Sequence, residues 1–445
     1  MRSIYLIICF TTCWMIGQAQ PVIDVVLRIT LDDALQIALV NNESIKIQER
    51  SILLARNNVS KANTGHLPTL DAVGSASYTN NFADLDLRTF QPEPPTINVS
   101  EGGVESTTVS AGVEAGYVLW DGGQRKHRYQ LLEGLSEIEK ARQEVLINEI
   151  YSGVSALFYE IVKLQNQEQL LKESIALNEE RIQKIENRAA FGKANKLAIV
   201  QAQTSLRQDE SALANISIVR SNLLLDLKDL INDENNNSYT LVADIDKPSL
   251  PNTDNWQESI RSNNPLCRLT QRGISVADIE VALSQTEGKP TLTSFANAGY
   301  FLQHNDVQQL KRIQTLGGTI GISARYNLYD GGSQKIKRQN AQINRDIKFM
   351  EQKQLYNRLF NSAKKELANM QLLQAQIDRE NSNQQTYQEN YDKVAERFKL
   401  GQLPEITLRE AQLALTNSKT LIYNLKVDFA KSKTRYLLLM GNTLD

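Results

Sequence analysis

The sequence has few of the residues that build disulfide-rich, metal-binding or catalytic proteins. It holds three cysteines and three histidines among 445 residues, and its net charge is −2. The widely separated histidines give no metal-ligand spacing, and the balanced charge gives no reason to expect a nucleic-acid partner. No glycine-rich phosphate loop, HExxH pair or nucleophile motif occurs. We therefore expect no enzyme activity, no cofactor and no metal.

Long apolar runs are also missing, except for one at the N-terminus. Arg2 precedes the run 4–16, and the small residues Gly17 and Ala19 follow it, a layout that is typical of a secretory signal peptide. We expect residues 1–19 to be removed, which would leave Cys267 as the single cysteine. No later apolar run reaches 18 residues, which argues against a transmembrane helix. An exported chain of this kind is either soluble or a β-barrel.

The sequence contains an internal repeat. "YVLWDGGQRKHRYQ" (Tyr117–Gln130) and "YNLYDGGSQKIKRQ" (Tyr326–Gln339) lie 209 residues apart, and "RAAFG" and "RFKLG" match at the same offset. Upstream, the two "PTL" segments match at an offset of 222, so 13 extra residues fall in the polar segment 80–107, which we expect to be a loop. We expect one repeat at 20–235, a linker at 236–257 and a second repeat at 258–445. Each repeat would hold a helix, two strands and a long helical hairpin.

Each Asp-Gly-Gly is followed by a long segment that favours helix. Residues 123–190 lack proline and carry a heptad seam, which Glu168 and Asn178 interrupt. Its apolar positions begin with Ile150, Val154, Leu157, Ile161 and Leu164. Such a helix is about 100 Å long at 1.5 Å per residue. A break at Gly192 or Gly401, with a new helix from Lys196 or Glu405, predicts two hairpins with tight tips.

Residues 108–119 and 319–328 alternate between apolar and polar side chains, with aromatics near their ends. Strands of about ten residues with this pattern are typical of a membrane β-barrel, although a soluble sandwich alternates in the same way. Very long helices in an exported chain favour the membrane. Four strands cannot close a membrane barrel, so several chains, two, three or more, would share one.

The Asp-Gly-Gly motifs would mark the corners where a strand becomes a helix. Glycine permits the sharp turn and aspartate caps the helix that follows. The corner residues are Asp121, Gly122, Gly123, Asp330, Gly331 and Gly332. The nearby aromatic residues Tyr117, Trp120, Tyr326 and Tyr329 suit the interfacial belt of a membrane protein.

Taken in order, "LDDALQIALVNN", the two "[WY]DGG" corners and the "RxxxG" tips followed by "AQ" resemble the TolC family of outer-membrane efflux and secretion ducts. The resemblance spans nearly the whole chain after residue 19. It implies a mostly α fold with a membrane β-barrel, in which long coiled-coil hairpins form an α-barrel. It also implies a homotrimer with a twelve-stranded barrel, four strands per chain, in the outer membrane of a Gram-negative cell. The partners would be outer-membrane lipid, a periplasmic adaptor (membrane fusion protein) and an inner-membrane transporter.

The same resemblance points to two functional sites. The tips correspond to the family's adaptor-docking turns, although their glycines also serve simply as helix caps. The tip residues are Arg188, Phe191, Gly192, Arg397, Phe398, Leu400 and Gly401. Family members often close the periplasmic mouth with a ring of acids; here Glu410 is at one such position and Thr407 is at the other, and an ordinary surface glutamate is the alternative for Glu410.

The sequence thus predicts a passive exit duct of a tripartite efflux pump or a type I secretion system. The alternative is a soluble periplasmic coiled-coil scaffold with a small β domain. The sequence predicts no particular cargo.

Overall fold

The computed structural model describes residues 26–88, 96–192, 195–233, 238–243, 245, 248–252, 254–305 and 311–441. The expected signal peptide, residues 1–19, lies outside the described residues. The chain forms two compact units. The tip unit comprises residues 1–41, 154–246 and 383–427, and the strand unit comprises 42–153, 247–382 and 428–445.

The long helices repeat with equal lengths. Helices α3 (Gln124–Ala190) and α7 (Ser333–Lys399) each have 67 residues, and α4 (Lys196–Ile231) and α8 (Glu405–Met440) each have 36. At 1.5 Å per residue, 67 residues extend about 100 Å. The two predicted helical hairpins and the start of each return helix are confirmed.

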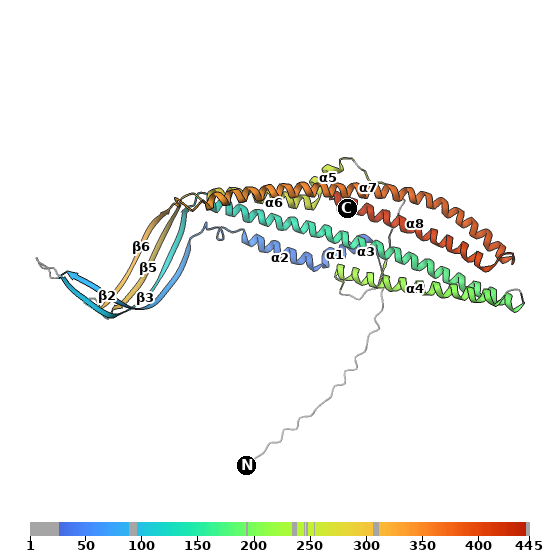
Figure 1. Ribbon diagram of the computed structural model, residues 1–445, viewed down its shortest axis with the longest axis horizontal. Coiled ribbons are helices and arrows are strands. Elements are labelled where there is room, and N and C mark those ends of the chain that lie inside the picture. The colour runs from blue at the N-terminus through green and yellow to red at the C-terminus, as the bar shows by residue number, and fades with distance from the viewer. Residues whose placement is uncertain are drawn as a thin grey trace, which may run out of the picture. The chain divides into compact units, whose positions relative to one another are not determined.

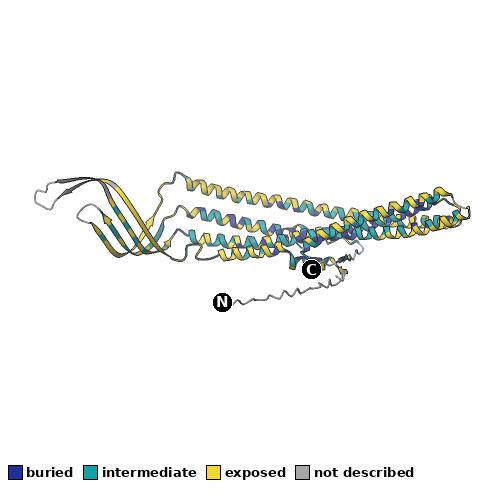
Figure 2. Ribbon diagram, turned by 90° about the horizontal axis from the view of Figure 1, so that it is seen from below, coloured by how far each residue is buried: buried dark blue, intermediate teal, exposed yellow. Residues whose placement is uncertain are grey.

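The strand unit contains a four-stranded antiparallel sheet, whose strands lead from and into helices (Figure 1). Its order is β2 (Thr69–Arg88), β3 (Thr96–Trp120), β5 (Thr291–Asn305) and β6 (Arg312–Arg325), so β2 and β6 are open edges. Among its described side chains none is buried, and Figure 2 shows the sheet in the colours of exposed and intermediate residues. The sheet therefore covers no core of its own chain.

The register places side chains of one kind in rows across this sheet. Leu70, Ala115, Ala296 and Ile320 are successive partners, and the next row is Asp71, Glu114, Asn297 and Thr319. Directly paired residues share a face, and successive residues alternate between faces. The sheet thus has an apolar row on one face and a polar row on the other, as membrane strands around a water-filled lumen require.

The strands are longer than predicted, and the polar segment 80–107 is not mainly a loop. The strands have 14 to 25 residues rather than about ten, and β2 and β3 pair from Asn80 opposite Glu105 to Arg88 opposite Thr96. Because each strand satisfies the backbone hydrogen bonds of the other, polar and glycine-bearing composition does not end them. The extra residues of the first repeat thus lengthen a hairpin.

The single helix predicted before the first pair of strands is divided in two. Helix α1 (Leu31–Asn41) ends before Asn42, whose side chain accepts a hydrogen bond from Ser44 N at 2.9 Å and begins α2 (Glu43–Asn58). In the second repeat, α5 (Trp256–Asn263) and α6 (Pro265–Thr286) are divided at Asn264 in the same way. An asparagine cap competes with helix continuation, which the apolar pattern alone did not reveal.

The segment 236–257, interpreted above as a linker, contains a strand. Strand β4 (Ser238–Leu241) pairs in parallel with β1 (Val26–Ile29) in the tip unit. Their buried side chains Ile29, Tyr239 and Leu241 give this unit a small core beside α1.

One 18-residue window of α3 is apolar enough to cross a membrane by length and composition, although it holds no uninterrupted apolar run of 18 residues. The seam residues Ile150, Val154 and Ile161 are buried. A helix of 67 residues is also far longer than the roughly 20 that span a bilayer. The apolar composition of α3 therefore reflects helix packing.

The Asp-Gly-Gly corners have the predicted capping geometry. Asp121 accepts hydrogen bonds from Gly123 N at 3.1 Å and Arg125 N at 2.8 Å, and Asp330 accepts from the equivalent amides at 3.0 and 2.8 Å. All four corner glycines have positive φ, between 69° and 94°. Aspartate and glycine together turn each strand into a helix.

We expect Gly122→Ala to destabilise the protein more than Gly331→Ala. Both glycines have φ near +70°, which costs an L-residue about 1–2 kcal/mol. A Cβ at Gly122 would also lie 2.5 Å from Cβ of Lys289, whereas nothing lies within 4 Å at Gly331. Thermal unfolding of the two variants in detergent measures the difference, and equal melting temperatures would contradict it.

Candidate functional site

The two hairpin tips each carry an exposed apolar side chain beside a glycine cap. Gly192 has a φ of 71°, and its N–H donates a hydrogen bond to Ala189 O at 2.9 Å. Gly401 has a φ of 77°, and its N–H donates a hydrogen bond to Phe398 O at 3.0 Å. The preceding residues Phe191 and Leu400 are 80% and 67% exposed. They occupy equivalent positions of the repeat, 209 residues apart. The caps thus present one apolar side chain at each tip.

The other predicted docking residues differ in their surroundings. Phe398 is buried in a cluster with Ile185, Ala202 and Leu408. Arg188 lies over its ring, with Cζ 5.8 Å from the ring centroid. A Cβ at Gly401 would approach a guanidinium nitrogen of Arg188 to 3.1 Å. Phe398 and Arg188 therefore join the two hairpins, while Phe191, Leu400 and the exposed Arg397 face outward.

A buried polar network lies beneath the tips, and it was not predicted from the sequence. Asp209 of α4 accepts hydrogen bonds from Ser174 Oγ and Asn178 Nδ2 of α3, both at 2.7 Å. It also pairs with Arg409 of α8, whose Nη1 lies 3.0 Å from Oδ2. Both charged side chains are less than 10% exposed. The carboxylate is thus saturated by partners from two other helices.

A second ion pair extends the network. Arg181 of α3 donates to Glu405 of α8 at 3.0 Å and also to Gln412, which itself donates to Ser174 Oγ at 3.1 Å. Burial lowers the pKa of Arg181, and the hydrogen bond and charge of Glu405 oppose this effect. Two buried cations and two buried carboxylates balance, so the network joins α3, α4 and α8 without net charge.

The sequence contained a signal for these contacts. Asn178 and Glu168 interrupt the apolar seam of α3, and a polar group at a seam position requires a partner. Glu168 lies 2.7 Å from Arg220 of α4 and 2.9 Å from Lys172. Lys172 lies on α3 itself, but Arg220 and Asp209 lie on α4, so the pattern of α3 alone could not identify those partners.

We expect the tip unit to lose stability below about pH 4.5, the ordinary pKa of a glutamate side chain. Burial raises the pKa of Glu168, but the hydrogen bond from Lys172 and the charge of Arg220 outweigh it and lower the pKa overall. A carboxylate with a lowered folded-state pKa adds stability at higher pH, and this is lost as the pH falls through that pKa. Thermal unfolding against pH should show a smaller acid loss for Glu168→Gln than for the exposed control Glu179→Gln.

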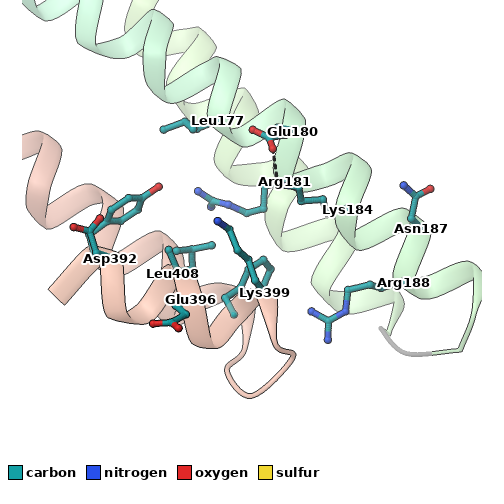
Figure 3. A pocket seen from close by; sticks show the side chains of 13 residues that line it. Leu177, Glu180, Arg181, Lys184, Asn187, Arg188, Asp392, Glu396, Lys399 and Leu408 are labelled. Carbon is teal, nitrogen blue, oxygen red and sulfur yellow. Dashed lines mark hydrogen bonds and ion pairs between the residues drawn. The ribbon is translucent and has the colours of Figure 1, made fainter. Parts of the chain in front are cut away.

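A groove of about 740 Å³ lies between the ends of α3 and α7. Figure 3 shows side chains of both charges around it: Arg181, Lys184 and Arg188 from α3, with Asp392, Glu396 and Lys399 from α7. Leu177 and Leu408 add apolar surface. Such a mixed lining suits a polar partner helix better than a hydrophobic ligand.

Of the two gate candidates on α8, Glu410 lies on the face opposite the buried side chains, and Thr407 lies at the edge of the buried face. Glu410 is exposed and Thr407 is half-buried, whereas Leu408, Arg409, Ala411 and Gln412 are buried. Glu410 is therefore free to face a lumen. The acidic ring stays a prediction, since it requires several copies of the chain.

Metal chemistry has no evident site in the part of the chain that the structure describes, where no group of three or more histidine, cysteine, aspartate or glutamate residues could hold an ion. Cys267 is buried, and burial raises the pKa of its thiol to about 11. The thiol is therefore protonated at neutral pH and a poor nucleophile.

The chain is similar to known outer-membrane channels. A family model described as outer membrane efflux protein matches residues 34–232. The Campylobacter jejuni CmeC outer membrane channel is 18% identical, with 92% of this chain and 85% of that chain covered and a TM-score of 0.74. The open state of the Neisseria gonorrhoeae MtrE outer membrane channel is 14% identical, with 93% and 89% covered and a TM-score of 0.72. The outer membrane protein VceC of Vibrio cholerae is 16% identical, with 93% and 97% covered and a TM-score of 0.70. No curated protein matches the sequence.

Proposed function

We propose that the chain is a member of the outer membrane efflux protein family, whose model matches residues 34–232, and that it is the exit duct of a tripartite efflux pump or of a type I secretion system. The family's members are passive outer-membrane channels that extend into the periplasm, and they are not enzymes. Transport through such a duct is driven by its partner, and the chain supplies the path.

The open four-stranded sheet is the observation that carries this proposal. Among the described residues, its edges β2 and β6 each have a free side, and one of its rows is apolar across all four strands. Unpaired backbone groups are costly in lipid, so β6 of one copy would pair with β2 of the next until the sheet closes. Three copies give twelve strands, which is the homotrimer implied by the family resemblance.

The adaptor would dock at the tips. Phe191 and Leu400 are highly exposed apolar side chains in the two turns, and the charged groove between α3 and α7 lies beside them. A helical partner would cover the apolar pair and match the charges of the groove.

Membrane fractionation tests the duct. The full chain, expressed with its signal in a Gram-negative cell, should reach the outer membrane, resist extraction by high salt and dissolve in detergent as a trimer. Planar-bilayer conductance should then show a water-filled pore. Release by salt without detergent would instead support the periplasmic scaffold and overturn the duct.

We expect the double variant Phe191→Ser and Leu400→Ser to lose adaptor binding without loss of the trimer. Ile218→Ser with Leu372→Ser is a matched control, since these side chains are 61% and 58% exposed and lie away from the tips. Cross-linking to the co-expressed adaptor should fall at least tenfold in the tip variant alone, because apolar anchors carry much of the binding energy of an interface. An equal loss in both variants would contradict docking at the tips.

A further inference from the structure

Basic side chains are concentrated where the four strands meet the helices. The junction segments 60–67, 121–130, 287–291 and 325–340 hold nine Lys and Arg residues against three carboxylates, although the whole chain has 49 basic and 51 acidic residues. The basic residues are Lys61, Arg125, Lys126, Arg128, Lys289, Arg325, Lys335, Lys337 and Arg338, and the acidic ones are Asp121, Glu287 and Asp330. We call these nine residues the junction belt.

Contacts between the segments show that the belt is continuous. Arg125 Nη1 lies 3.4 Å from Gly65 O, and Lys289 Nζ lies 3.2 Å from Gly122 O. Lys337 Nζ pairs with Glu287 at 2.8 Å. Segments from both repeats therefore meet at one level of the strand unit, where the strands end and α3 and α7 begin (Figure 1).

The belt directly adjoins an exposed apolar and aromatic surface. Exposed large side chains on the ends of β3 and β6 and in the turns beyond are Tyr117, Leu119, Trp120, Ile322, Tyr326, Leu328 and Tyr329. Aromatic side chains of this kind mark the boundary between hydrocarbon and headgroups. Arg125 Cζ lies 5.9 Å from the ring centroid of Tyr117, so the basic groups reach that boundary.

Several charged groups of the belt have no ion-pair partner among the described residues. Lys126, Arg128, Lys335 and Arg338 are exposed, and none of them forms an ion pair or side-chain hydrogen bond with any described residue. The first turns of α3 and α7 contain no acid, although the helix dipole favours one there. Helix packing and capping therefore do not explain this cluster. Both repeats nevertheless carry it, since Lys126 is equivalent to Lys335 and Arg128 to Lys337.

We propose that the junction belt binds the headgroups of anionic phospholipids in the periplasm-facing leaflet of the membrane. This inference rests on the proposed membrane duct. A phosphodiester headgroup with net negative charge complements several lysine and arginine side chains, and its acyl chains would lie against the adjoining aromatic surface. A zwitterionic headgroup of the same size gains much less from these charges. The belt would thereby fix the height of the barrel in the membrane.

Lipid binding to the intact trimer tests this proposal. The detergent-solubilised trimer is titrated with phosphatidylglycerol or with phosphatidylcholine of the same acyl chains, and bound lipid is counted by native mass spectrometry. In the test variant Lys126, Arg128, Lys335 and Arg338 are replaced by Gln; in the control the same change is made at the exposed Lys353, Lys364, Lys365 and Lys393 of α7. We expect about a tenfold or greater loss of phosphatidylglycerol affinity in the test variant only, since that variant removes four positive charges that attract an anionic headgroup.

Three outcomes would overturn the lipid assignment: an equal loss in the control, undiminished phosphatidylglycerol binding by the test variant, or displacement of the lipid by equimolar inorganic phosphate. Salt extraction of membranes from the same cells distinguishes a failure of the lipid proposal from a failure of the proposed duct. A chain released by salt fails as a duct, whereas a salt-resistant trimer without headgroup preference overturns the belt alone.

Discussion

Arg409→Met is expected to destabilise the tip unit by about 3–5 kcal/mol, the usual cost of removing one partner of a buried ion pair. The Arg409 guanidinium donates hydrogen bonds to both Asp209 and Ser174, and the residue is 5% exposed. Methionine fills a similar volume but leaves the Asp209 carboxylate buried with only Ser174 and Asn178 as donors. The loss is therefore electrostatic in origin.

Combining Asp209→Leu with Arg409→Met should recover most of this loss, because replacing both members of a buried pair by apolar groups is often neutral or stabilising. Arg207→Met, on the exposed face of α4, removes the same charge as a control and should change stability by less than about 0.5 kcal/mol. Limited proteolysis at the tips and thermal unfolding of the detergent-solubilised protein measure the three variants. If Arg409→Met were as stable as Arg207→Met, the buried pairing would be wrong.

The pairing would also bear on opening of the proposed duct. Arg181, Asp209 and Arg409 connect α8 to α3 and α4, so an outward movement of α8 must either break these contacts or carry all three helices together. Buried charges make the first route expensive unless water enters. An adaptor that contacts both tips, rather than one, could move the helices as a group.

The sequence predicted the elements whose signals are local and repeated. The 67-residue helices follow from proline-free heptads, and the corners follow from Asp-Gly-Gly, which the capping bonds of Asp121 and Asp330 confirm. The breaks at Asn42 and Asn264 were locally visible too, as a repeated Asn-Asn pair, but were not interpreted as caps.

Features that depend on partners distant in sequence were missed. The extension of β2 and β3 depends on pairing between two polar strands, which composition alone assigns to a loop. The network of Asp209 and Arg409 joins helices 200 residues apart, and only one of its members, Asn178, disturbed a recognisable pattern. Tertiary pairing fixes both features, and one sequence taken alone contains no direct record of it.

Ile320→Arg should prevent stable insertion of the sheet, whereas Thr319→Arg should be tolerated. Ile320 is 86% exposed in the single chain and belongs to the apolar row with Ala296, Ala115 and Leu70. An arginine on the lipid face costs about 2–4 kcal/mol near the bilayer midplane in each copy. Thr319 is its neighbour on the opposite face, in the row of Asp71, Glu114 and Asn297, where a charged side chain would be hydrated.

Each variant is measured by its outer-membrane yield and by the urea concentration that extracts it from the membrane. Because both variants introduce an arginine, each controls for the charge and size of the other. Equal behaviour of the variants would mean that neither face meets lipid. A reversed order would place the row of Asp71 and Glu114 in the hydrocarbon, which their charge forbids without a partner. The expected order would instead assign opposite faces of one strand to lipid and to water. An apolar row opposite a row with two carboxylates fits the proposed barrel wall, which would set the first row against lipid and the second against water.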